Sequence, residues 1–208
     1  MKTTVLFIDE DAIERRSCVD VLKEIFAGTP LELKAIQPLD TLAGYAVLVN
    51  QDTLAALILD QRLQTSGQVN YSGAELAAYL RGISCRIPIV ILTNYHEDDF
   101  SHQGWAVEWI ISKHLLRDPS GVPAQEFKKR LTRQIETCSN LLAARENRFH
   151  ELIVKSSREQ LTPDEENELR ELNGERVAPV AAEEREKQAK LDTEIATLKK
   201  LLGRDSLL

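Results

Sequence analysis

The sequence predicts an α/β protein, with a doubly wound, five-stranded parallel sheet followed by an all-α helical extension. Three observations predict this fold. Five short apolar runs alternate with amphipathic stretches over the first two thirds of the 208 residues. Chemically distinctive residues lie where four of these runs end, and from about Ala124 the pattern changes to apolar residues at helical spacings. Alternating strands and helices are typical of a parallel sheet covered on both faces.

The predicted strands are apolar runs bounded by polar or turn-forming residues. A continuous apolar run is expected of a strand that is buried on both faces. The five runs cover Val5–Ile8, Leu31–Ile36, Leu54–Leu59, Ile87–Leu92 and Trp109–Ile111.

Helices are predicted between most of these strands. The first follows Asp11 with apolar residues on one face, and Gly28-Thr29-Pro30 ends it. The second runs to about Asn50, and the third covers about Gly73–Arg81 after a polar loop.

The extension begins with a long helix, whose apolar residues alternate at spacings of four and three, with only Arg145 breaking the series. It is predicted to be about 30–35 residues long, or roughly 50 Å, and therefore to leave the body of the sheet domain. The seam could close on the chain's own later helices or on a second subunit. Its members are Leu131, Ile135, Cys138, Leu142, Phe149 and Leu152.

Two further helices are predicted in the extension. Thr162-Pro163-Asp164-Glu165 has the pattern of a capped helix start, and Asn173-Gly174 is expected to end that helix early. Residues 177–182 are a candidate linker. A last helix with Leu191, Ile195, Leu198 and Leu202 is expected to be capped by Gly203.

Composition excludes several classes of protein. The formal net charge of −7 argues against a broad nucleic-acid surface. The three cysteines lack the spacing of a disulfide framework or a zinc site. No signal-peptide core or membrane-length apolar run is present, so we expect a cytoplasmic protein without membrane contacts.

Acidic residues lie where the first and third predicted strands end. Asp9, Glu10 and Asp60 should meet at the carboxyl edge of the sheet, where parallel α/β sheets bind ligands. Three carboxylates in one place repel each other, and a hard cation such as Mg²⁺ would offset that repulsion. A carboxylate held there could attack a phosphoryl donor, and Lys113 and the Thr93 hydroxyl could bind the product.

The set Ile8-Asp9-Glu10-Asp11, Leu59-Asp60-Gln61-Arg62-Leu63, Ile91-Leu92-Thr93 and Ser112-Lys113 resembles the receiver domain of two-component response regulators. The resemblance covers about residues 3–138 and implies a flavodoxin-like fold. It implies that a histidine kinase phosphorylates Asp60, while Asp9, Glu10, Asp60 and the backbone carbonyl of Arg62 hold Mg²⁺. It also implies that Thr93 and Lys113 sense and bind the phosphoryl group, and that Gly73 opens the third helix.

The sequence departs from the receiver pattern near the last strand. His114 follows Lys113 where receivers usually carry proline, and Ile110 replaces an aromatic residue, with Trp109 beside it. Asn94 stands where a small residue is usual, and the loop after Asp60 is longer. Asp11 is expected to face solvent or cap the first helix rather than bind metal.

We therefore expect a receiver domain at 1–138 and a helical hairpin or coiled coil at 139–208. The expected function is a phosphorylation-controlled response regulator that signals through dimerisation or protein docking by its tail, without acting on an external substrate. The alternative is a receiver-like scaffold or phosphate sink that binds partners constitutively. The tail is too acidic to indicate DNA binding.

Overall fold

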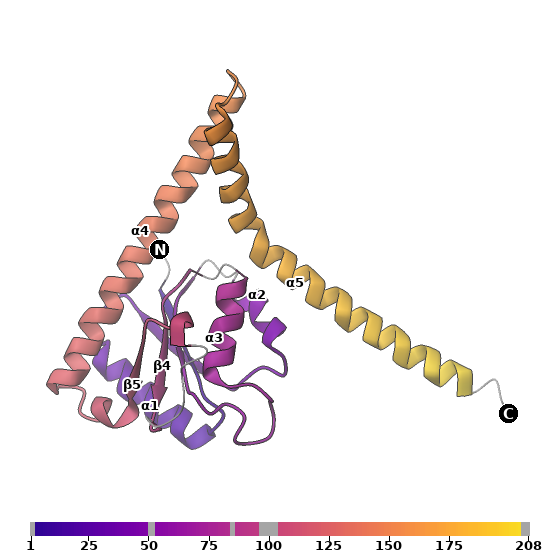
Figure 1. The fold of residues 1–208 in the computed structure, drawn as a ribbon. Helices are drawn as coiled ribbons and strands as arrows, with labels where there is room; N and C mark the ends of the chain where they lie inside the picture. Colours follow the sequence, from indigo (N-terminus) through magenta and orange to yellow (C-terminus); the bar gives the residue numbers. More distant parts are fainter. Residues whose placement is uncertain (1–2, 50–52, 84–85, 96–103, 205–208) are drawn as a thin grey trace.

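The computed structural model describes residues 3–49, 53–83, 86–95 and 104–204, and its core is one parallel sheet (Figure 1). The strand order is β2-β1-β3-β4-β5, and every pairing is parallel. This confirms the predicted doubly wound fold. The strands are β1 (Thr4–Ile8), β2 (Glu32–Ile36), β3 (Leu54–Leu59), β4 (Ile89–Thr93) and β5 (Trp109–Ser112).

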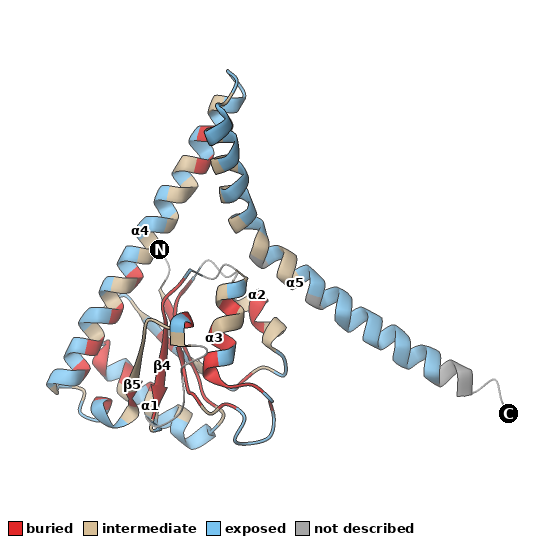
Figure 2. Cartoon of the chain, in the orientation of Figure 1, coloured by how far each residue is buried: buried red, intermediate tan, exposed pale blue. Residues whose placement is uncertain are grey.

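Helices cover both faces of this sheet. On one face α1 (Ala12–Ile25) and the base of α4 (Val122–Ser156) pack against apolar side chains such as Phe7. On the other face α2 (Tyr45–Val49) and α3 (Gly73–Gly82) enclose a second apolar cluster around Leu57. Burial concentrates in this body, whereas the far part of the tail is exposed (Figure 2).

Short 3-10 helices complete the body: η1 (Leu42–Gly44), η2 (Gly104–Ala106) and η3 (Lys113–Leu116). The helix expected to run to about Asn50 is shorter than predicted, because it consists of η1 followed by α2. Gly44 ends η1 directly before α2 begins at Tyr45, and glycine and valine are weak helix formers. Asn50 itself lies outside the described residues.

The long helix α4 has 35 residues, as predicted, and only its first part covers the sheet. Leu131 and Ile135 are buried in the body, whereas Phe149 and Leu152 are buried near its far end, where it lies beside α5. Both ends of the seam therefore close within one chain. Beyond the body, α4 projects away from the sheet (Figure 1).

The final helix, α5 (Pro163–Arg204), corrects three predictions. It runs for 42 residues through Gly174, through the expected linker at 177–182 and through Gly203. One interior glycine costs only about 1 kcal/mol, and contacts with α4, α2 and η1 support the helix on either side. The predicted start is confirmed, because Thr162 Oγ1 accepts from Glu165 N and Thr162 N donates to the Glu165 carboxylate.

The two tail helices form a hairpin that returns to the body. After its start beside α4, α5 passes α2 and η1 and then projects on its own (Figure 1). Within the described residues, none of the helices has the length and apolar character needed to cross a membrane.

Candidate functional site

Three residues from distant parts of the chain meet at the carboxyl edge of the sheet. Asp9 follows β1, Asp60 follows β3, and Lys113 follows β5 at the start of η3. Lys113 Nζ lies 2.7 Å from Asp9 Oδ2 and 2.7 Å from Asp60 Oδ1. Both carboxylates are buried. The structure thus unites the predicted phosphoacceptor, one predicted metal ligand and the predicted phosphate-binding lysine in one ion triad.

Backbone groups and burial set the electrostatics of this triad. Asp60 Oδ2 accepts from Arg62 N at 2.7 Å, and Asp9 Oδ1 accepts from Asp11 N at 2.8 Å. Burial raises the pKa of Asp60 above its ordinary value, and Lys113 limits the rise. Burial opposes the charge of Lys113, but the two carboxylates outweigh it and hold the pKa of the lysine above its usual range. Lys113 is therefore a cation at neutral pH.

Glu10 contributes a third carboxylate at the edge of the triad. Its Oε2 atom is buried and has no hydrogen-bond partner among the described residues. Burial is the main reason that the pKa of Glu10 is raised, and the nearby charges of Asp60 and Asp9 add to it. Asp11 instead accepts from Ile13 N and Glu14 N, which confirms it as the cap of α1.

The donor set suits a hard divalent cation such as Mg²⁺. Lys113 pairs with two carboxylates, the charge of Glu10 acts on the same three groups, and the orphaned oxygen of Glu10 needs a positive partner. In the described residues, no three acidic, histidine or cysteine side chains already surround a common metal position. The Arg62 carbonyl accepts from Thr65 N and Thr65 Oγ1, which leaves its role as a ligand a prediction.

Thr93, whose hydroxyl the sequence predicted to lie at the site, is the last residue of β4. Thr93 is fully buried, and its Oγ1 accepts from Tyr95 N at 3.0 Å. Its neighbour Asn94 has a buried Oδ1 without a partner among the described residues. The Arg62 guanidinium lies 3.4 Å from the centre of the Tyr95 ring, so this pair joins the loops after β3 and β4 beside the site. Sequence reasoning missed the role of Tyr95.

The loop after Asp60 is tied to the start of α3. Gly73 N donates to Gln61 O, and Ala74 N donates to Gln61 Oε1. A Cβ at Gly73 would lie 2.2 Å from the backbone oxygen of Asp60, which explains why glycine opens this helix. Ser72 and Glu75 complete a capping box at the same point.

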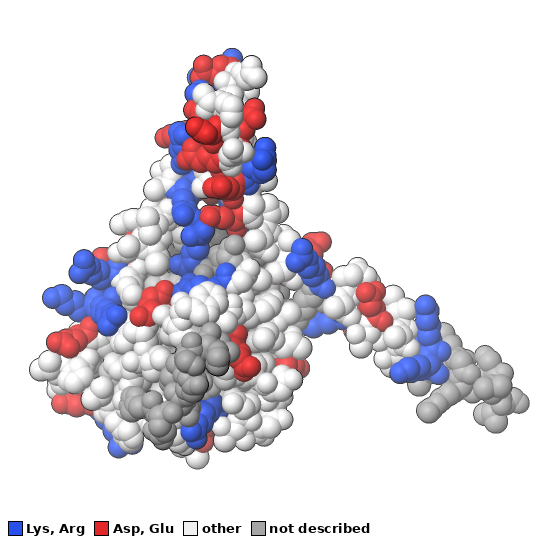
Figure 3. Space-filling model, in the orientation of Figure 1, with Lys and Arg blue, Asp and Glu red and all other residues white. Residues whose placement is uncertain are grey.

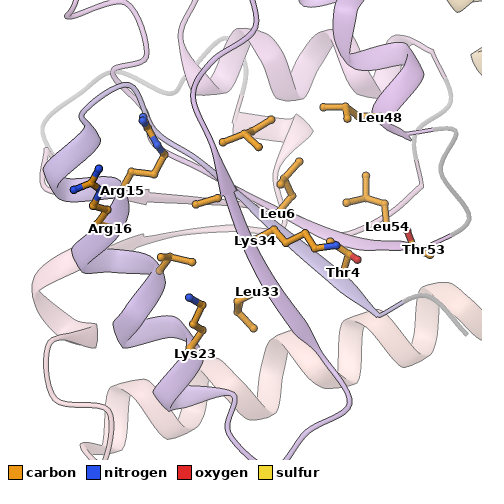
Figure 4. A pocket seen from close by; sticks show the side chains of 13 residues that line it. Thr4, Leu6, Arg15, Arg16, Lys23, Leu33, Lys34, Leu48, Thr53 and Leu54 are labelled. Atoms are coloured by element: carbon orange, nitrogen blue, oxygen red, sulfur yellow. The ribbon is translucent and has the colours of Figure 1, made fainter.

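A hollow of about 590 Å³ lies elsewhere, at the open edge of β2 (Figure 4). Its charged lining residues are all basic, and Arg15 also donates to the backbone oxygen of Asp9 at 2.6 Å. The carboxylates of the triad do not line it, so the candidate chemistry belongs to the strand ends. The basic residues are Arg15, Arg16, Lys23 and Lys34.

The site is also connected to the base of α4. Lys113 begins η3, and Leu116 of η3 is buried in the same cluster as Phe127 of α4. Trp109 of β5 packs against Phe127 with ring centres 5.4 Å apart, and the Arg130 guanidinium lies 4.0 Å from the centre of the Trp109 ring. A change at Lys113 therefore has a short packed route to the long helix.

Comparisons with known proteins found no matching family model and no matching curated protein. Among solved structures, response regulator TrrA of Thermotoga maritima in complex with Mg²⁺–BeF is 20% identical, with a TM-score of 0.45 over 64% of this chain and 99% of that one. A complex of TrrA with histidine kinase ThkA matches at 22% identity and a TM-score of 0.41, over 54% and 86%.

A lysine decarboxylase of Francisella novicida also matches, at 15% identity and a TM-score of 0.45 over 78% of this chain and 21% of that one. The solved structures that resemble this chain thus include both response regulators and an enzyme. The fold assignment rests on the observed strand order and pairing, and the functional argument on the strand-end site.

Proposed function

We propose that this protein is a phosphorylation-controlled response regulator of a two-component system, in which Asp60 accepts a phosphoryl group from a histidine kinase. The observation that carries the proposal is the buried triad in which Lys113 bridges Asp60 and Asp9. Burying two carboxylates and an ammonium costs free energy, and a purely structural position could be filled by apolar residues instead. Such groups concentrate at functional sites.

In the proposed reaction, an Asp60 oxygen attacks the phosphorus of a phosphohistidine as the bond from phosphorus to the imidazole nitrogen breaks. The imidazole nitrogen keeps the electron pair, and Asp60 becomes an acyl phosphate. Lys113, still a cation, pairs with the phosphoryl oxygens, and the Thr93 hydroxyl donates to one of them. Mg²⁺ held by Asp9, Glu10, Asp60 and the Arg62 carbonyl would offset the negative charge that accumulates during transfer.

The signalling output follows from the ion pair that Lys113 would lose when Asp60 is phosphorylated. Once a phosphoryl group occupies Asp60, Lys113 no longer pairs with the same carboxylate oxygen, and η3 begins at this residue. Leu116 and Phe127 pass the adjustment to α4, and through it to the tail. We therefore propose that phosphorylation acts through the helical tail, which dimerises or docks on a partner.

The test is the intact mass of the protein after incubation with Mg²⁺ and acetyl phosphate. We expect a single phosphoryl adduct on the wild type and none on Asp60→Asn, which keeps the size of the side chain. Glu10→Gln should lower the rate of adduct formation and weaken the stabilisation of the fold by Mg²⁺, measured as a shift in Tm. An unmodified wild type, beside a control receiver that is modified, would refute the proposal.

The phosphate-sink alternative has one observation in its favour. The Thr93 hydroxyl already accepts from Tyr95 N, and Ile110 replaces the aromatic residue that would follow a movement of the threonine. A sink would form the adduct without any change in the tail. Sizing the protein with and without a phosphoryl mimic separates the two, because only the switch predicts a change in assembly or tail position.

A further inference from the structure

The exposed apolar residues of α5 form a single stripe. At about 100° of rotation per residue, the five large ones fall within about 60° of one another around the helix. Each is between 40% and 57% exposed, so nothing in the described chain covers them. The five are Val177, Val180, Leu191, Ile195 and Leu198.

The stripe lies on the side of α5 that faces away from the receiver body. The opposite side faces Tyr79 and Ile83 across a hollow, to which α5 contributes Ala182, Arg185, Ala189, Lys190, Thr193 and Glu194. The mean direction of these six residues is about half a turn from the stripe, and Glu194 lies nearest to it. Packing against the body in the same chain therefore leaves the stripe free for another molecule.

The spacing within the stripe is that of a coiled coil. Leu191, Ile195 and Leu198 are separated by four and then three residues, which places leucine at position d and isoleucine at position a of a heptad. This combination favours two parallel strands. Upstream, Glu184 and Gln188 occupy the next d and a positions, so the favourable seam begins after them.

The flanking charges match a second copy of the same helix. In a parallel pair each g residue faces the e residue five positions further along the partner. Lys187 would face Asp192 of the second copy, and Glu194 would face Lys199 of the second copy. Both pairs are of opposite charge. In this structure Lys187 Nζ is paired with Glu183 Oε1 on the helix surface, where ion pairs exchange at little cost.

We propose that residues 187–200 of α5 pair with the same segment of a second copy as a parallel, two-stranded coiled coil. The partner is thus another copy of this chain, and the proposal deepens the tail output proposed above. About two heptads form a weak seam, because short helices gain little from propensity alone. The dimer is therefore concentration-dependent, and a small change in the position of α5 is enough to shift it.

Sedimentation velocity of the unphosphorylated full chain tests the pairing over a range of micromolar concentrations. We expect a rising dimer fraction for the wild type and a monomer throughout for Ile195→Asp. Ala196→Asp is the matched control, because it adds the same charge at the adjacent exposed position outside the stripe. If the two variants associate equally, or if the wild type is monomeric at every concentration, the stripe does not bind a second copy.

The parallel orientation of the two helices can be tested separately, in a chain whose cysteines at 18, 85 and 138 are replaced by serine. Leu198→Cys should form an intermolecular disulfide on mild oxidation, because d residues meet their own counterparts only in a parallel pair. Thr197→Cys, one position away, should not. Glu194→Lys should weaken association, and adding Lys199→Glu should restore it.

These measurements need no phosphorylation, so their failure is distinguishable from the failure of Asp60 to form an adduct. A dimer in which Leu198→Cys forms no intermolecular disulfide would overturn the parallel arrangement. A charge reversal without an effect would overturn the proposed pairing between g and e residues.

Discussion

The body around the sheet and the tail use ion pairs in opposite ways. In the body, Lys113 is only 10% exposed and bridges two buried carboxylates at the end of an apolar sheet. In the tail, the hairpin of α4 and α5 is joined by pairs such as Arg148 with Glu168, whose side chains are both 41% exposed. The buried triad resists change because each charge depends on the others, whereas the exposed pairs can be broken one at a time.

The hairpin has little apolar contact to add to these pairs. Phe149 and Leu152 are its buried apolar residues among those described beyond the body. Charged side chains of both signs cluster along the projecting hairpin (Figure 3). The cross-helix pairs are Lys155–Glu165, Arg148–Glu168, Arg145–Glu175 and Arg176–Glu146, and Glu175 also reaches Arg86 of the body. The tail is thus the part of the molecule that conditions can rearrange most easily.

Removing the cation of the triad should change the stability of the fold most. Lys113→Met should destabilise the fold by about 3–5 kcal/mol at neutral pH, because Asp9 and Asp60 are left buried without their partner. Lys155→Met, in the hairpin, should cost far less, because the lysine and its acidic partners lie at the surface. Urea unfolding of both variants measures the contrast. Similar losses would show that the triad is as weakly coupled as the surface pairs.

Alanine substitutions at Gly73 and Gly174 should change stability in opposite directions. Gly73→Ala should destabilise the fold by about 1–3 kcal/mol, because its Cβ would meet the backbone oxygen of Asp60 at 2.2 Å. Gly174→Ala should stabilise α5 by about 0.5–1 kcal/mol, because nothing lies within 4 Å of its added carbon. Thermal unfolding of the body and amide hydrogen exchange of α5 report the two effects, and equal signs would contradict the contact at Gly73.

The same contrast explains what the sequence could predict. The strands and their chemical ends were predictable, because a continuous apolar run fixes a buried strand and parallel strands share one carboxyl edge. The sequence alone therefore predicted that Asp9, Asp60 and Lys113 lie close together. The contact of Arg62 with Tyr95 was not predictable, since it depends on how two irregular loops meet.

The tail was predicted less well, for a physical reason. Gly174 is a poor helix residue, and local propensity alone predicted that the helix would end there. Contacts with α4, α2 and η1, distant in sequence, override that preference and carry α5 onward. The N-terminal cap at Thr162 was predicted correctly because a capping box is entirely local.

Weakening the exposed pairs of the hairpin should change the stability of the fold least. Raising the salt concentration should separate α4 from α5, since surface ion pairs are screened while the buried triad is not. Spin labels on Asn147→Cys and Asn173→Cys, in a chain without its native cysteines, would report the distance between the helices. Glu175→Gln, which removes the partner of Arg86 and Arg145, should lower the salt concentration at which they separate.

Low pH, like high salt, should separate α4 from α5. The hydrogen bond from Lys155 is the main reason that the pKa of Glu165 falls to about 2, from an ordinary value of 4.5. A depressed carboxyl pKa stabilises the paired state above the ordinary value, and that contribution is lost as pH falls from about 4.5 towards 2. The label distance should therefore increase over this range, and Glu165→Gln should remove part of the pH response. A hairpin that stays closed in both high salt and acid would mean that Phe149 and Leu152 hold it, and that the ion pairs contribute little.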